Sequence, residues 1–110
     1  MITNQILLNT IEGLKGISRV DFCIFDTEEK VLASTFEDSQ MFEGSVRSFV
    51  ESQADSQVIQ GYQFFKIFDE QQLEYILLVE GDSENSYMIG KMAAFQIQNL
   101  LVAYKERFDK

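Results

Sequence analysis

The sequence predicts a single α+β domain in which helices flank an antiparallel sheet, and three observations lead to this class. The chain has 110 residues with no proline and six glycines, so no linker divides it and one domain over 1–110 is expected. Short apolar segments with strand character are joined by brief polar turns, as in antiparallel hairpins. Apolar residues at helical spacing occur at both ends of the chain and in its middle.

The first half of the chain predicts a helix, a hairpin and a second helix. Apolar residues at helical spacing run over 3–14, and Gly13 and Gly16 are expected to end this helix. The segments 19–25 and 31–35 have strand character and are joined by a polar turn. A helix with acidic surroundings is expected over about 40–52.

The second half predicts another hairpin and a long C-terminal helix. The strands are expected at 62–68 and 73–80, and the helix at about 86–108. The stretch 54–60 is ambiguous and is compatible with a brief extended piece. The order is therefore α-β-β-α-β-β-α, with antiparallel strands and helices gathered against the sheet. This arrangement is typical of PAS, GAF and profilin-like domains.

The C-terminal helix carries two apolar stripes. The first contains Ile89, Ala93, Ile97, Leu100, Leu101, Tyr104 and Phe108. The second is rotated around the helix axis and contains Met88, Met92, Phe95 and Val102. One stripe is enough to attach a surface helix to its own core, so the second predicts a dimer interface or a contact with another domain. The alternative is a helix buried on all sides within its own domain.

Charge and composition exclude several classes of partner. There are 18 acidic and 9 basic residues, a net charge of −9, and the basic residues are scattered, so this segment is not expected to contact nucleic acid or anionic membranes. The single cysteine, Cys23, cannot form an intramolecular disulfide, and the longest apolar runs, of five residues as at 75–79, are far too short to span a bilayer. We therefore expect a cytoplasmic protein. Because the chain ends in a charged helical segment without a cap, we also expect the natural protein to continue.

The sequence offers little chemistry for catalysis. It contains no histidine, one cysteine and no glycine-rich phosphate loop, so we expect no catalytic residue, no metal site and no cofactor. Paired carboxylates fall in expected turns, where solvated loops are the simpler interpretation. Cys23 fits a buried strand position better than a redox site. Two cations are candidate anchors for an anionic ligand: Arg47 in the middle helix, and Lys66 in an aromatic strand. Lys66 at a sheet edge with its ammonium in water is the alternative.

Several segments are recognisable in combination. They are NQIL at 4–7, DFCIFD at 21–26, KVLAS at 30–34, EG at 43–44 and IGKMAAFQIQNLLVAYKE at 89–106. Together they resemble the N-terminal sensory domain of bacterial sugar-diacid-utilisation and purine-catabolism-type transcriptional regulators. The resemblance implies a PAS- or GAF-like sensor that precedes a C-terminal helix-turn-helix region, so that DNA would be contacted only by that downstream domain.

The resemblance also implies a pocket for a small-molecule effector. The residues that it places around the pocket are Phe22, Ile24, Ser34, Glu43, Gly44, Arg47, Tyr62, Phe64 and Lys66. Whether this pocket is open or filled by its own side chains is left undecided by the sequence. The resulting hypothesis is a non-catalytic, homodimeric sensor domain that signals through its C-terminal helix. The alternative is a ligand-free homodimerisation scaffold similar in outline to roadblock-type dynein light chains.

Overall fold

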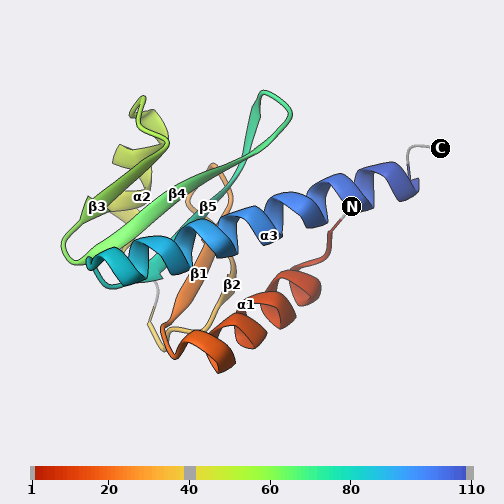
Figure 1. Cartoon of the computed structure of the whole chain (residues 1–110). Coiled ribbons are helices and arrows are strands. Elements are labelled where there is room, and N and C mark those ends of the chain that lie inside the picture. Colours follow the sequence, from red (N-terminus) through yellow and green to blue (C-terminus); the bar gives the residue numbers. More distant parts are fainter. Residues whose placement is uncertain (1, 39–41, 109–110) are drawn as a thin grey trace.

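The computed structural model describes residues 2–38 and 42–108 of the chain, apart from the side chains of Glu43, Arg107 and Phe108. Within these ranges it contains one five-stranded antiparallel sheet and three helices, which confirms the α+β class (Figure 1). The elements are α1 (Asn4–Ser18), β1 (Phe22–Phe25), β2 (Val31–Ser34), α2 (Glu43–Glu51), β3 (Ser56–Ile59), β4 (Tyr62–Asp69), β5 (Gln72–Glu80) and α3 (Glu84–Phe108). No helix in the described ranges is both long and apolar enough to cross a bilayer.

The predicted order was wrong in one respect, because a fifth strand lies in the stretch that the sequence left ambiguous. β3 pairs antiparallel with β4 across a two-residue turn formed by Gln60 and Gly61. Both turn residues have positive φ, of 53° and 86°, and this backbone suits the twist of a tight hairpin. The order is therefore α-β-β-α-β-β-β-α. β3 is short and half polar, so its pairing with β4 defines it better than its own pattern does.

The C-terminal end of the first helix also differs from the prediction. α1 begins after Thr3, whose side chain accepts a hydrogen bond from the backbone N–H of Ile6 as an N-cap. The helix continues through both glycines that were expected to end it. It ends at Arg19, which has a left-handed φ of 65° and donates its N–H to the Lys15 carbonyl. The predicted start of the middle helix, at 40, lies outside the described residues.

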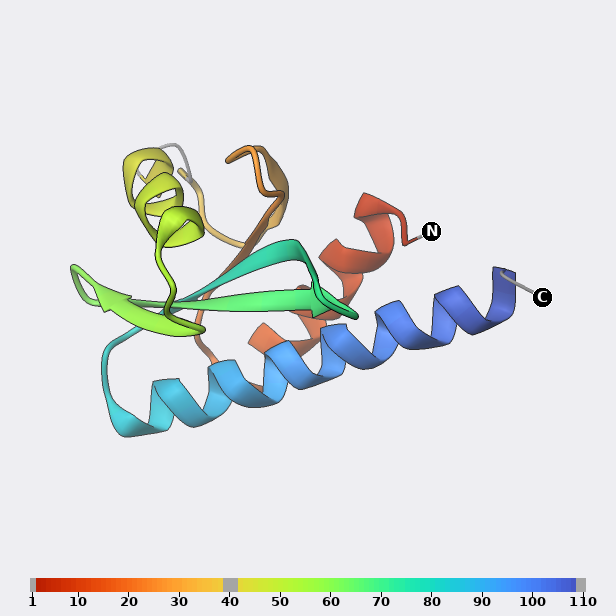
Figure 2. The same ribbon diagram turned by 90° about the horizontal axis from the view of Figure 1, so that it is seen from above.

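The strand order is β2-β1-β5-β4-β3, and the helices cover both faces of the sheet. Figure 2 shows α2 on one side of the sheet and α1 and α3 on the other. On the α1/α3 side, the buried core consists of Ile2, Leu7, Ile11, Phe22, Ile24, Ala33, Phe65, Ile67, Tyr75, Leu77, Val79, Ala93 and Ile97. On the α2 side, it consists of Cys23, Phe25, Phe42, Val46, Phe49, Phe64, Ile76 and Leu78. Alternate residues of the central strands thus enter two separate cores.

Candidate functional site

The inner side of α3 anchors the helix to the sheet. Ala93 and Ile97 are fully buried in the α1/α3-side core, and Ile89, Leu100, Leu101 and Tyr104 pack against that core as half-buried side chains. Among the described side chains, this confirms the first apolar stripe as the one that faces the domain. Near the C-terminal part of the helix, the side-chain amide of Gln98 donates a hydrogen bond of 2.8 Å to the backbone carbonyl of Phe68.

The outer side of α3 carries the second stripe. Met88, Met92, Phe95 and Val102 are 57%, 68%, 68% and 49% exposed. At about 100° per residue these four side chains lie opposite Ala93 and Ile97 on the helix. The stripe is therefore not used by the domain's own core. We call Met88, Met92, Phe95 and Val102 the outer stripe.

The exposed apolar surface continues from α3 onto α1. Ile17 of α1 is 85% exposed, and it shares with Met92 a hollow of about 480 Å³ between the two helices. Gly13, Leu14 and Gln96 also line this hollow. The sequence did not indicate Ile17, because the first helix was expected to end before it. Had helical spacing been continued through both glycines, Ile17 would have fallen one turn beyond Leu14 on the flank of the helix.

The structure does not bring all the expected effector-pocket residues together. Phe22 and Ile24 are fully buried in the α1/α3-side core, whereas Tyr62, Phe64 and Lys66 lie on the α2 side of the sheet. These two groups are separated by the sheet itself. Effector binding by this combined set would therefore require ligand contacts on both faces of one sheet.

The remaining expected pocket residues are placed as follows. Gly44 is exposed in the first turn of α2, and the side chain of Glu43 lies outside the described residues. Ser34 is half-buried and forms hydrogen bonds with the backbone of Phe36: its hydroxyl accepts from the N–H at 3.0 Å and donates to the carbonyl at 3.5 Å. Neither Gly44 nor Ser34 adds a charged anchor to the α2 side.

Aromatic side chains of the chain itself pack the space between α2 and the sheet. Phe36, Phe42 and Tyr62 form a cluster with ring centroids 4.7 to 6.0 Å apart, in edge-to-face geometry. Deeper in this layer, the rings of Phe49 and Phe64 are 5.7 Å apart and both are fully buried. At these positions the α2 side is filled by its own core.

The two candidate anchor cations make different contacts. The Lys66 ammonium donates a hydrogen bond to the backbone carbonyl of Ser52, just after α2, and lies 5.1 Å from the ring centroid of Phe49. Lys66 therefore fastens the end of α2 to the sheet. Arg47 is exposed and forms an ion pair with Glu29 in the β1–β2 turn, with 2.7 Å between Nη2 and Oε2.

Substitution of the two cations is expected to affect stability unequally. Lys66→Met keeps the apolar stem but leaves the Ser52 carbonyl without its charged donor, and we expect a loss of about 1 kcal/mol of unfolding free energy. Arg47→Ala removes an ion pair on an exposed arginine, and we expect a change below about 0.5 kcal/mol. Urea unfolding of both variants measures the difference. Equal losses would contradict the fastening role of Lys66.

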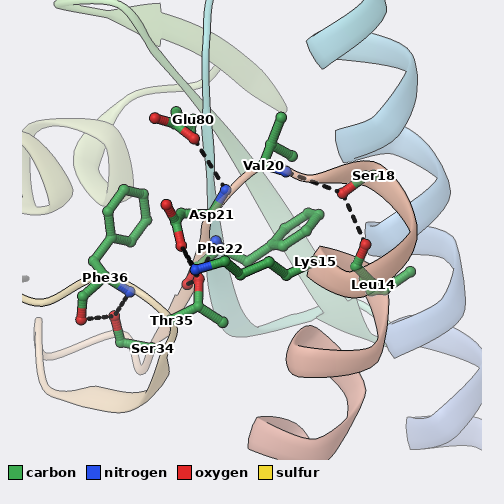
Figure 3. Close-up of polar contacts among 10 residues, drawn as sticks. All are labelled: Leu14, Lys15, Ser18, Val20, Asp21, Phe22, Ser34, Thr35, Phe36 and Glu80. Atoms are coloured by element: carbon green, nitrogen blue, oxygen red, sulfur yellow. Dashed lines mark hydrogen bonds and ion pairs between the residues drawn. The ribbon is translucent and has the colours of Figure 1, made fainter.

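A polar junction fixes the C-terminal end of α1 to the sheet (Figure 3). Lys15 of α1 contacts the Asp21 carboxylate at 2.7 Å, and the Thr35 hydroxyl donates to the same oxygen at 2.7 Å. Thr35 also accepts a hydrogen bond of 2.9 Å from the backbone N–H of Phe22, and the Asp21 N–H donates to Glu80. The junction thus joins α1, β1, β5 and the residue after β2.

The contact between Lys15 and Asp21 shifts the pKa values of both side chains. Burial alone would raise the pKa of Asp21, but the hydrogen bonds from Lys15 and Thr35 outweigh it and hold this pKa below its usual value. The hydrogen bond to Asp21 in turn raises the pKa of Lys15. Because Lys15, Asp21 and Thr35 satisfy one another, we interpret the junction as structural.

Asp21→Asn should destabilise the protein in a pH-dependent way. A lowered folded-state pKa means that the Asp21 carboxylate contributes stability above its unfolded-state pKa, about 3.9, and loses it as the pH falls through the lower folded value. We expect the variant to be less stable by about 1 kcal/mol at pH 7, because the Lys15 contact loses its charge partner. The difference should shrink below about pH 4. Urea unfolding of both proteins at several pH values measures it, and a pH-independent difference would contradict this account.

Among the residues that the structure describes, no three carboxylate or thiol side chains gather in a way that could hold a metal ion. A comparison with models of protein families and a comparison with curated proteins found no match to this chain.

Proposed function

We propose that this chain is a non-catalytic homodimerisation domain of a regulatory protein, and that it pairs with a second copy of itself through the outer stripe of α3. The observation that carries the proposal is the exposure of Met88, Met92, Phe95 and Val102 on the side of α3 opposite its core side. Fully burying a side chain such as Met or Phe stabilises an assembly by roughly 1.5–3 kcal/mol. A row of them left in water on an ordered helix favours an interaction surface.

A second copy is favoured as the occupant because of the charge of this helix. The whole chain has a net charge of −9, so two copies repel each other over most of their surfaces. Among the described side chains of α3, however, Glu84 and Glu106 are balanced by Lys91 and Lys105. Two α3 helices can therefore approach each other without the repulsion that other faces would produce. The same stripe serves both partners, as in a two-fold symmetric interface.

The outer stripe is long enough to run beside a second helix over several turns. From Met88 to Val102 the helix rises by about 21 Å, which is about four turns. Ile17 and the adjoining hollow extend the apolar surface sideways onto α1. A standard interface covers roughly 800 Å² per partner. We therefore expect pairing of moderate affinity, with a dissociation constant in the micromolar range or below.

The regulatory part of the proposal rests on the sequence resemblance. In such a protein, the paired domains would set the relative orientation of the two regions that follow the α3 helices. An effector that bound one orientation more tightly would increase the fraction of dimers in that orientation. Effector binding stays a prediction. A saturable rise in melting temperature with dicarboxylates, purine catabolites, amino acids or acidic sugars would support it.

The experiment that tests the proposed function is sedimentation equilibrium of the purified chain over a wide concentration range. We expect a monomer–dimer equilibrium centred in the micromolar range. A protein that stays monomeric at several hundred micromolar would overturn the proposal. A larger, open-ended assembly would also contradict it, because a two-fold interface closes on itself.

A further inference from the structure

The outer stripe, taken together with the exposed Asn99, has the spacing of a coiled-coil seam. Met88, Met92, Phe95, Asn99 and Val102 follow one another at intervals of four, three, four and three residues. This is the heptad pattern in which Met92 and Asn99 occupy a positions, and Met88, Phe95 and Val102 occupy d positions. All five side chains are exposed on α3. This spacing keeps all five side chains on one face of α3, where they can meet a second helix that supercoils around it.

We propose, building on the homodimer proposed above, that two α3 helices pair as a parallel, in-register, two-stranded coiled coil, and that Asn99 specifies this arrangement. In a parallel pair without stagger, each a residue meets the same residue of the second copy. The amide of Asn99 then faces the amide of its counterpart, and each can donate a hydrogen bond to the other. A single asparagine at an a position is a known means of fixing register and oligomer state at some loss of stability.

The antiparallel alternative leaves Asn99 without a polar partner. In an antiparallel pair, a positions face d positions of the other helix, so Asn99 would be set against Met88 or Phe95 of the second copy. An amide buried against such side chains, without a hydrogen-bond partner, costs roughly 1–3 kcal/mol. A cost of this size weakens pairing by roughly ten- to a hundredfold. The position of one asparagine therefore selects the parallel pairing.

The positions that flank the seam are compatible with this pairing. Lys91 and Gln98 occupy g positions, and in a parallel pair they face Gln96 and Ala103 at e positions of the second copy. No like charges are placed opposite one another at these positions. Gln98 is held by its hydrogen bond to the Phe68 carbonyl and so stays at the margin of the seam.

The arrangement of the domain leaves room for a second helix. α3 is the outermost element on its side of the sheet, with α1 beside it rather than over its outer side (Figure 2). The C-terminal part of α3 also extends past the end of the sheet in both views. A parallel pair brings the C-terminal ends of the two helices to the same end of the dimer. A change in the relative orientation of the two domains would therefore move both C-terminal ends at the same end of the dimer.

Disulfide trapping of the full chain tests the orientation. Asn99→Cys should form an interchain disulfide with its own copy under mild oxidation, because equivalent a positions meet across a parallel seam. Gln96→Cys is the matched control: it is also exposed on α3 but lies at an e position, and it should crosslink much more slowly. The native Cys23 is fully buried, so the unmodified chain gives the background. In an antiparallel dimer, a mixture of Met88→Cys and Asn99→Cys proteins would crosslink with each other while Asn99→Cys alone would not, and this result would overturn the inference.

A second variant tests the role of Asn99 by affinity. Asn99→Val should strengthen pairing by about tenfold in dissociation constant, because it removes a buried polar group from the seam. It should also allow higher oligomers or staggered pairs, seen as added species in sedimentation. An unchanged dissociation constant would place Asn99 outside the interface and overturn this inference, while the dimer itself would still support the proposed function. A monomeric parent chain would overturn both.

Discussion

Phe95→Glu is expected to convert the dimer into a monomer without unfolding the domain. Phe95 is the middle residue of the outer stripe and is 68% exposed, so its side chain contributes little to the core of its own domain. In the dimer, the substitution buries two carboxylates near the two-fold axis. An uncompensated buried charge costs about 3–5 kcal/mol, which corresponds to a rise in the dissociation constant of about 100- to 1,000-fold or more. Sedimentation equilibrium measures this change, and far-ultraviolet circular dichroism checks that the fold is kept.

The control for this prediction is Val58→Glu. Val58 lies on the edge strand β3 and is 52% exposed, so it offers a different route to pairing, through the edge of the sheet. A charge there should leave the α3-mediated dimer intact. If Val58→Glu breaks the dimer and Phe95→Glu does not, pairing occurs through the sheets and the proposed interface is wrong.

Gly90→Ala is expected to destabilise the protein by about 2–3 kcal/mol, although alanine is the better helix former. Gly90 lies on the inner side of α3, where the helix backbone lies close to the side chains of Phe65 and Val79 in the sheet. A Cβ atom at this position would clash with Cε2 of Phe65 and lie 2.6 Å from Cζ of the same ring and 3.1 Å from Cγ2 of Val79. The Phe65 ring is only 2% exposed and cannot swing away, so either the ring or the helix must shift.

Gly16→Ala is the matched control for this glycine effect. Gly16 is also within a helix, α1, but a Cβ atom added there would meet no atom within 4 Å. The substitution should therefore stabilise the protein by about 0.5–1 kcal/mol, through helix propensity alone. Urea unfolding at one fixed protein concentration compares the two variants, because dimerisation makes stability depend on concentration. Changes of the same sign in both variants would contradict the close approach of α3 to Phe65.

The sequence predicted the long elements well, because their patterns are strong and local. The C-terminal helix was expected at about 86–108 and is observed at Glu84–Phe108, and the described side chains of its first stripe face the core as predicted. The local sequence pattern did not predict the strand β3. This strand is an edge element whose four residues alternate weakly, and it is held by its pairing with β4 and by the turn at Gln60 and Gly61. The whole hairpin lies within 56–65, but Gln-Gly is not one of the turn sequences that strongly predict a hairpin, so the short strand before it was not recognised.

The candidate pocket shows a second limit of the sequence. Alternation within a strand predicts that Phe22 and Ile24 share one face, and that Phe64 and Lys66 share one face. It cannot say whether those are the same face of the sheet. Only the register decides this: Cys23 and Phe64 are both paired with Leu78 of β5, so Phe64 lies on the face of Cys23, and Phe22 lies on the other.

The sequence by itself therefore determined the class of the domain, the long final helix and the presence of a second apolar stripe on it. Tertiary structure decided that the domain itself does not cover the second stripe, that Ile17 extends that surface from α1, and that the expected pocket residues are divided between two cores. The physical reason is the range of the interactions. Helix periodicity is set by residues three and four apart. The exposure of a side chain, and the face of the sheet on which it lies, depend on strands and helices that meet only when the chain is folded.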